Sequence, residues 1–541
     1  MENQNKTSRK PSLIVQSSIN GQDDVQAVRV VSDAEERSYS DWINQALRNE
    51  EICQKYLPID YNKLYEACSD GVLLCKMINY SVPDTIDMRA VNVGKKLETI
   101  FCKNENLSLA VQSASSIGCC VVNIGPIDLG NGVKHIVLGL LWQIIRIGLI
   151  GKINLANHAE LVALLRDGES LEDLKQLSPE EILIRWVNYH MEKANVSRRI
   201  SNFNTDIMDS EIYTYLINQI APSECRSKMM PPNEILRSND NVQRAENVLS
   251  NASAMNAKAF VEANDIAMVT QKGKNREKLN MAFVAHLFNN YPALNITEKV
   301  IQEFDIVEET LEEKTYRNWM NSMGVEPYLN YLYSDLRNGI ALLHLIDVIQ
   351  PKTVNWETVT TKFNPMRKLF QMQDNCLAFI NYAKKLNLKL VGLSAENIRE
   401  TETTLVLGLC FQLLRKYTFQ LLQKLQPNNF NKSVEDKDII EWANKKCQST
   451  GKSESVIRSF KDLNIRSSKP ILHLIDSIKP NSVDYSMITN NPLDDAKYAI
   501  TVARKIGANV YALPQHVVDL NQKMILTIYA CLMLVDLQKH S

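Results

Sequence analysis

The sequence predicts an all-α protein made of four similar domains in tandem. At 541 residues the chain is several times longer than one hydrophobic core usually serves. The tripeptide Trp-x-Asn occurs four times, starting at Trp42, Trp186, Trp319 and Trp442, and the separations of 144, 133 and 123 residues each correspond to one small domain. Strand signals are weak throughout, so each repeat is expected to be a helical domain of about 110 residues.

Each Trp-x-Asn lies in the first predicted helix of its repeat. Apolar residues recur three or four positions apart around each tryptophan, as Tyr39, Ile43 and Leu47 do around the first, which places them on one helix face. The four tryptophans are therefore expected to be core residues, and truncating one to alanine should cost its domain about 3–5 kcal/mol. The helix of the second repeat has a clear start at Ser178-Pro179-Glu180-Glu181, with an N-cap serine, a proline and a glutamate in the expected order.

Three further helices are expected in every repeat. A second, apolar helix stops at a proline, which cannot continue it, at Pro83, Pro222, Pro351 and Pro480. A third helix is expected at 105–117, 245–255, 374–386 and 495–506. The closing helix is apolar nearly all round and is therefore expected to be buried, at 135–149, 279–288, 404–417 and 522–537.

Composition excludes several classes of protein. The 61 Lys and Arg nearly balance the 62 Asp and Glu, so the broad positive field of a general nucleic-acid binder is missing and no nucleic-acid partner is expected. The eleven cysteines are odd in number and form no Cys-x-x-Cys pair, which is typical of reduced thiols in a cytoplasmic protein. The first thirty residues have no apolar signal-peptide core, and the most apolar stretch, Ile136 to Ile150, is too short to span a membrane.

A few sequence patterns resemble enzyme or metal-site motifs, but none of them has the required residues or spacing. Gly451-Lys452-Ser453 resembles the end of a phosphate-binding loop, but Lys446 stands where the loop needs its first glycine. Asp206, Asp209 and Glu211 are clustered with a spacing that fits no standard metal site, and no histidine pair has zinc-binding spacing. We therefore expect no enzyme activity, no catalytic residue, no metal and no cofactor.

The order of these motifs resembles the fimbrin (plastin) family. The resemblance covers residues 37–541 and includes "DGVLLCKMIN" at Asp70–Asn79, "TIDMRAVN" at Thr85–Asn92, "IGCCVVNIG" at Ile117–Gly125, "HIVLGLLWQIIRIGL" at His135–Leu149 and "ARKIGANVYALP" at Ala503–Pro514. It implies four tandem calponin-homology domains arranged as two actin-binding units. The expected boundaries are a flexible N-terminal tail at 1–36, domains at 37–152 and 178–292, a linker at 293–313, and domains at 314–422 and 434–541.

The resemblance also implies a function. A monomer with two such units grips two filaments of actin and bundles them in the cytoplasm, as part of the actin cytoskeleton. The linker contains Glu308, Glu309, Glu312 and Glu313 and is expected to be a solvated acidic helix or connection. Because so short a linker keeps the two units close together, tight bundles are favoured over loose networks.

Two departures from the family pattern limit that expectation. Fimbrins usually carry a pair of calcium-binding EF-hands, but some 36 residues precede Arg37 and no EF-hand loop occurs in the sequence, so built-in calcium control is not expected. The third domain has Arg337-Asn338-Gly339 where the first has Ser69-Asp70-Gly71. This divergence leaves open an alternative, a single-sided adaptor whose second unit (314–541) docks another protein or microtubules.

Candidate contact residues follow from the helices that the family is thought to use for actin. These are the first and last helices of each unit's leading domain and the first helix of its second domain. Their apolar faces are committed to the core, so polar or projecting side chains are the candidates, and basic ones suit the acidic surface of actin. The candidates are Arg37, Lys134, His135, Gln143, Arg146, Arg185 and Tyr189 in the first unit, and Arg317, Gln412, Arg415, Lys416 and Tyr417 in the second.

The N-terminal tail contains one candidate modification site. In Arg9-Lys10-Pro11-Ser12 the serine stands three residues after an arginine, as many basic-directed kinases prefer. Phosphorylation of Ser12 would add charge to this segment, and an inert disordered tail is the alternative.

Overall fold

The computed structural model describes residues 33–268, 274–296, 308–425 and 434–540, and these residues contain helices and no β-strand. Each repeat has four long helices. Domain 1 has α1 (Asp33–Ala46), α3 (Val72–Ser81), α4 (Ile100–Ser116) and α6 (Lys134–Leu149), and domain 2 has α8 (Pro179–Lys193), α9 (Glu211–Ile220), α12 (Asn241–Ala254) and α14 (Lys274–Asn290). Domain 3 has α16 (Leu311–Ser322), α18 (Ile340–Ile349), α19 (Lys368–Lys385) and α21 (Thr403–Lys424), and domain 4 has α22 (Asp436–Ser449), α23 (Lys469–Ile478), α24 (Pro492–Lys505) and α26 (Gln522–His540).

Short helices connect the long ones: α2 (Leu64–Cys68), α5 (Pro126–Gly130), α7 (Leu171–Lys175), α10 (Ser223–Arg226), α11 (Pro232–Ile235), α13 (Ala263–Ala267), α17 (Leu332–Leu336), α20 (Ala395–Arg399) and α25 (Pro514–Val518). The second long helix of each domain ends two residues before its proline, as the sequence predicts. Ser178 caps α8 in a reciprocal capping box with Glu181.

Two helices begin earlier than the sequence boundaries suggest. Helix α1 starts at Asp33, inside the expected tail, and α16 starts at Leu311, inside the expected linker. In α16 Thr310 and Glu313 form a capping box, and Glu312 accepts a hydrogen bond from Asn521. Glu312 and Glu313 therefore lie in a helix, which is one of the two readings of the linker, while Glu308 and Glu309 are exposed residues that precede it. Residues 297–307 lie outside the described residues.

The asparagine of each Trp-x-Asn fastens a distant piece of backbone. The side-chain amide of Asn44 accepts from the backbone N–H of Ile59 at 2.7 Å and donates to its carbonyl at 3.0 Å. The same two-sided contact joins Asn188 to Ile200, Asn321 to Leu329, and Asn444 to Ile457. Because the clamped residue is buried in every domain, the asparagine satisfies backbone groups that water cannot reach.

The tryptophans of the motif lie on the opposite side of the same helices. Trp42, Trp186 and Trp319 are buried. Trp442 is partly exposed, packs against the core of domains 3 and 4, and donates from its indole nitrogen to Asp536. The fourth copy therefore differs from the fully buried core residue that the pattern predicts, and the buried carboxylate of Asp536 accepts from its indole N–H.

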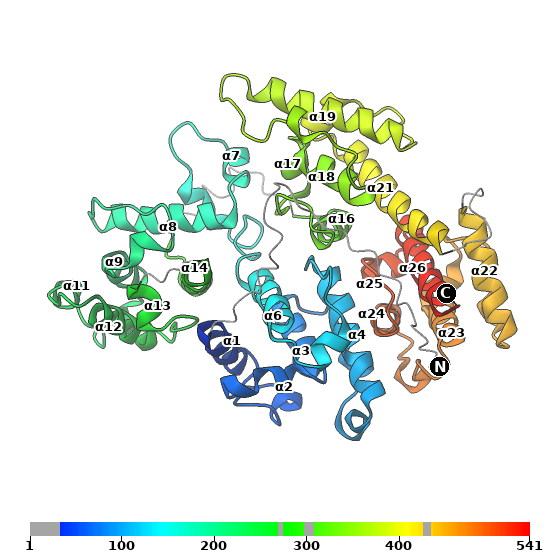
Figure 1. Ribbon diagram of the computed structural model, residues 1–541, viewed down its shortest axis with the longest axis horizontal. Coiled ribbons are helices and arrows are strands. Elements are labelled where there is room, and N and C mark those ends of the chain that lie inside the picture. The colour runs from blue at the N-terminus through cyan, green and yellow to red at the C-terminus, as the bar shows by residue number, and fades with distance from the viewer. Residues whose placement is uncertain (1–32, 269–273, 297–307, 426–433, 541) are drawn as a thin grey trace, which may run out of the picture.

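The buried apolar side chains form two continuous clusters. One runs through domains 1 and 2, from Tyr39 to Phe288, and the other through domains 3 and 4, from Tyr316 to Val535. Domain 1 also contributes Ala90 to the second cluster. Figure 1 shows domain 1 (blue to cyan) between domain 2 (green) and domain 4 (orange to red), with domain 3 on the remaining side. Domains 1 and 2 therefore fold around one shared core, and domains 3 and 4 fold around another. We call the first pair unit 1 and the second pair unit 2.

The two hydrogen bonds that the motif's asparagine makes to a buried backbone residue, here called the asparagine clamp, lead to a stability prediction for domain 3. Replacing Asn321 with alanine leaves the N–H and C=O of the buried Leu329 without partners, which should cost about 1–3 kcal/mol. We expect a lower unfolding midpoint in chemical denaturation. Asn381→Ala is the matched control, since Asn381 is an exposed residue of α19. Equal midpoints for the two variants would contradict the clamp.

Candidate functional site

The first and last helices of domain 1 present few free polar side chains. Lys134 and His135 lie exposed at the start of α6. Lys134 forms an ion pair with Glu36 at 3.1 Å and lies over the ring of Tyr65. Arg37 forms an ion pair with Glu262 of domain 2, with its Nη2 3.4 Å from the carboxylate. His135 therefore stands at the rim of a surface whose neighbouring cations already have intramolecular partners.

Further along α6, both remaining candidates face other parts of the chain. The Gln143 amide accepts from the N–H of Cys120 at 2.7 Å and donates to its carbonyl at 3.0 Å. The guanidinium of Arg146 lies 4.5 Å from the ring centroid of Tyr328, a residue of domain 3. In this arrangement Arg146 therefore connects unit 1 to unit 2 by a cation–π contact.

The two candidates on α8 differ in their burial and in their intramolecular contacts. Arg185 is largely buried and bonds Glu169 through both terminal nitrogens, at 2.5 and 3.2 Å. This pair fastens α8 to the connection between domains 1 and 2. Tyr189 is half-buried, packs edge-on against His190, and carries the ammonium of Lys193 over its ring. Burial lowers the pKa of His190 to about 4, so that ring is neutral at physiological pH.

Some candidates of unit 2 have intramolecular partners, and others are half-buried residues of α21. Arg317 is largely buried and binds Glu309 with two nitrogens, at 2.5 and 2.9 Å. Arg415 pairs with Asp436 at 2.6 Å and thereby joins α21 to the start of α22. Tyr417 packs near Trp319, and burial raises the pKa of its hydroxyl to about 12. Gln412 and Lys416 are half-buried residues of α21.

The structure places the arginines among the candidates in intramolecular contacts, which sequence patterns do not reveal. The ion-pair partners Glu262, Glu169 and Asp436 come from other helices or other domains. Exposed cations that remain free for a partner are therefore fewer than the sequence suggests. Ser12 lies outside the described residues.

Sequence reasoning missed an exposed apolar pair at the start of the third helix of both leading domains. In domain 3, Leu369 and Phe370 are 57% and 71% exposed, and in domain 1, Ile100 and Phe101 are 77% and 57% exposed. The two pairs occupy the same position, five and six residues before Asn375 in α19 and before Asn106 in α4.

The two asparagines make equivalent contacts, which confirms that correspondence. Asn375 donates to the carbonyl of Asn338 and bonds both backbone groups of Thr360. Asn106 donates to the carbonyl of Asp70 and bonds both backbone groups of Asn92. Helix α12 of domain 2 has no exposed large apolar side chain, and α24 of domain 4 has only Leu493. The feature therefore belongs to the leading domain of each unit.

Basic side chains accompany both pairs. Lys362 and Arg367 are exposed beside the domain 3 pair, and Lys95 and Lys96 are exposed just before the domain 1 pair. We call each set the apolar–basic patch of its domain: Lys362, Met366, Arg367, Leu369 and Phe370 in domain 3, and Lys95, Lys96, Ile100 and Phe101 in domain 1. In domain 1, Lys479 of domain 4 lies over the ring of Phe101, 4.3 Å from its centroid, so this copy is the less accessible one.

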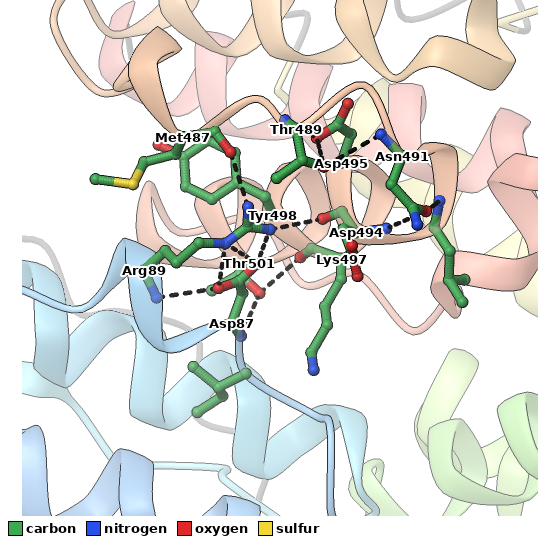
Figure 2. A network of polar contacts seen from close by, with 12 residues as sticks. Asp87, Arg89, Met487, Thr489, Asn491, Asp494, Asp495, Lys497, Tyr498 and Thr501 are labelled. Atoms are coloured by element: carbon green, nitrogen blue, oxygen red, sulfur yellow. Dashed lines mark hydrogen bonds and ion pairs between the residues drawn. The ribbon is translucent and has the colours of Figure 1, made fainter.

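The seam between domains 1 and 4 is rich in polar contacts. Figure 2 shows Arg89 reaching from domain 1 to the carbonyls of Met487 and Asp494, at 2.8 and 2.9 Å, while Asp87 holds its guanidinium. The backbone N–H of Asp87 donates to Thr501 Oγ1 at 3.0 Å. One loop of domain 1 is thus bonded directly to α24.

A second cluster at the seam is ionic. The Glu105 carboxylate lies 2.7 Å from Lys479 Nζ and 3.4 Å from Lys505 Nζ, both in domain 4. Burial alone would raise the pKa of Glu105, but hydrogen bonds from Lys479 and Asn92 and the nearby charges outweigh it and lower the pKa. Arg504 is buried without a carboxylate and donates to the carbonyls of Thr85 and Val510. Burial lowers its pKa to about 10.

Three domains meet at Tyr511. Its hydroxyl lies 2.9 Å from Ser115 Oγ of domain 1 and 2.6 Å from Ser322 Oγ of domain 3, and all three residues are buried. Asn318 of α16 donates to the carbonyl of Ser116 close by. The halves are therefore joined by a network of hydrogen bonds and ion pairs, whereas each half is held together by an apolar core.

The described part of the chain contains no cluster of three or more His, Cys, Asp or Glu side chains able to hold a metal ion. None of its described helices has the length and apolar content that crossing a membrane requires.

Comparisons with known proteins agree with this architecture. The family model of the calponin homology (CH) domain matches residues 33–150, 177–293, 310–419 and 433–537. The chain is 44% identical to plastin-3 of Danio rerio over 518 residues, covering 93% of this chain and 80% of that protein. It is 43% identical to fimbrin of Dictyostelium discoideum over 520 residues, covering 94% of this chain and 81% of that protein.

A solved structure shares the fold over most of the chain. The actin-crosslinking core of Schizosaccharomyces pombe fimbrin superposes with a TM-score of 0.76 at 33% identity, covering 93% of this chain and all of that one. The repeats described above are thus calponin homology domains, and the chain is a four-domain protein of that class. Within the class it belongs to the plastin and fimbrin family.

The polar seam leads to a prediction about the overall arrangement. Replacing both Arg89 and Lys505 with alanine removes four hydrogen bonds across the seam, three to backbone carbonyls and one to the side chain of Asn92. It also leaves Asp87 and Glu105 with fewer partners. We expect the halves to separate, which small-angle X-ray scattering detects as a larger radius of gyration. The control is Lys63→Ala with Lys445→Ala, two exposed lysines of the same two domains. Identical scattering curves would show that these bonds do not hold the seam.

Proposed function

We propose that this chain crosslinks actin filaments into tight bundles, each unit binding one filament. The observation that carries the proposal is the division of the chain into two units with separate apolar cores, in a member of the plastin and fimbrin family. The related solved structure is that of an actin-crosslinking core. A crosslinker needs two binding surfaces on one molecule, and two units on one chain supply them without a second copy. The chain acts as a monomer in the actin cytoskeleton of the cytoplasm.

The surfaces that bind the filament combine five candidate residues that are at least partly exposed with the apolar–basic patches. Lys134, His135 and Tyr189 belong to unit 1, and Gln412 and Lys416 to unit 2. The patch of each leading domain adds exposed apolar area next to unpaired lysines or arginines. Such a combination suits an acidic protein surface with apolar pockets, because the charges steer association and the aromatic ring contributes buried area.

Bundling itself is tested by sedimentation of actin filaments with the full chain. At low speed, bundles pellet and single filaments do not, so we expect actin in the low-speed pellet. We expect the same amount with calcium and with a chelator. Filaments that carry the protein at high speed but stay in the low-speed supernatant would contradict crosslinking and favour the single-sided adaptor.

The domain 3 patch gives a sharper test of unit 2. Phe370→Asp places a charge on a side chain that is 71% exposed, so the fold should be unaffected. We expect unit 2 to bind the filament about tenfold more weakly, a loss of about 1.4 kcal/mol, and therefore less actin in the low-speed pellet. Binding at high speed should remain, because unit 1 is intact.

Val391→Asp is the matched control, since Val391 is 86% exposed in the same domain and lies outside the patch. If both variants bundle like the wild type, the patch takes no part in filament binding.

A further inference from the structure

A polar depression lies where domain 1 meets domain 2, at the far ends of α1 and α12. It has a volume of about 470 Å3 and is lined by Gln45, Arg48, Ser253, Asn256 and Lys258. This volume is within the usual range for small-molecule sites. The lining contains two cations, one hydroxyl and two amides, and no carboxylate.

Both cations are available to a ligand. Neither Arg48 nor Lys258 forms a hydrogen bond through its side chain or an ion pair within 4 Å with any described residue, and both side chains are exposed. This contrasts with the arginines of the predicted filament-binding surfaces, which have intramolecular partners. Two unpaired cations from different domains in one depression create a local positive field that favours an anion.

Arg48 and Lys258 are not needed to satisfy free carbonyls at the C-terminal ends of α1 and α12. Positive side chains at a helix C-terminus often satisfy free carbonyls. Here the carbonyls of Ala252 and Ser253 at the end of α12 already accept from the backbone N–H groups of Ala257 and Asn256, at 2.8 and 2.9 Å. At the end of α1, the carbonyl of Ile43 accepts from the N–H of Leu47. Arg48 and Lys258 are therefore free to serve another partner, while the hydroxyl of Ser253 already donates to the carbonyl of Leu249 at 2.8 Å and can only accept.

The surrounding acidic groups confine the anion to one side. Glu246 and Glu262 line an adjoining depression that shares Ser253 and Lys258, and Asp41 of α1 interacts electrostatically with both Glu262 and Lys258. An anion is repelled from that side and attracted to the space between Arg48 and Lys258. The amide N–H groups of Gln45 and Asn256 then face the phosphate oxygens as donors, and the hydroxyl oxygen of Ser253 can accept from a ligand hydroxyl.

We propose that this depression binds a phosphorylated polyol of the inositol phosphate type, either free or as the headgroup of a lipid. The phosphates bind Arg48 and Lys258, and the hydroxyls bond the three neutral side chains. Such a ligand bridges domain 1 and domain 2 beside the contact of Trp42 with Phe260, whose ring centroids are 4.7 Å apart. Binding therefore stabilises unit 1 in its joined arrangement. This site is separate from the proposed filament contacts of unit 2.

The test titrates inositol trisphosphate into the full chain, without actin, by isothermal titration calorimetry. We expect saturable binding at one site that becomes about tenfold or more weaker in Arg48→Gln/Lys258→Gln, because two charge-assisted contacts are lost. Lys63→Gln/Lys228→Gln is the control, with the same charge change on exposed lysines of the same two domains. A second arm measures flotation with phosphatidylcholine vesicles that contain or lack phosphatidylinositol bisphosphate.

The outcomes separate the two ligand sources. Calorimetric binding without flotation identifies the free ligand, and flotation that depends on the phosphorylated lipid and on Arg48 and Lys258 identifies the headgroup. The proposal is overturned if neither probe binds, or if the pocket and control variants lose the same affinity. Because actin is absent, these outcomes are independent of the bundling test.

Discussion

The structure depends on how its buried apolar surface is divided. Domains 1 and 2 share one continuous core and domains 3 and 4 share another, while the contacts between the halves are largely hydrogen bonds and ion pairs, such as those of Arg89 and Glu105. Apolar burial is lost completely when a core is opened, whereas polar groups at a seam exchange partners with water at modest net cost. Each pair of domains is therefore one folding unit, and the seam is the place where the molecule can divide.

Within each domain, the first helix makes a different structural contact on each of two opposite sides. Its tryptophan packs toward the core, and its asparagine, two residues later, bonds both backbone groups of a distant buried residue such as Ile59 or Leu329. Both sides are thereby committed to the fold. Binding must use what remains, which is the rim of these helices and the exposed ends of neighbouring ones such as Leu369 and Phe370.

The sequence predicted the helices, their proline stops and the four-domain order, because local periodicity and proline chemistry determine these features. It did not predict the early start of α1, where Glu36 is buried against Lys134 and Tyr65 from later in the chain. It also could not show that Arg37 and Arg146 have partners in domains 2 and 3, since such pairs join residues far apart in sequence. Comparing the repeats position by position would have found Phe101 and Phe370.

The central claim is that both units bind actin independently, and separating the halves tests it most directly. Fragments 33–296 and 308–541 each contain one complete core and should fold on their own. We expect each fragment to pellet with actin filaments at high speed and neither fragment to bundle them at low speed. A folded 308–541 fragment that stays in the supernatant at high speed would show that unit 2 does not bind actin.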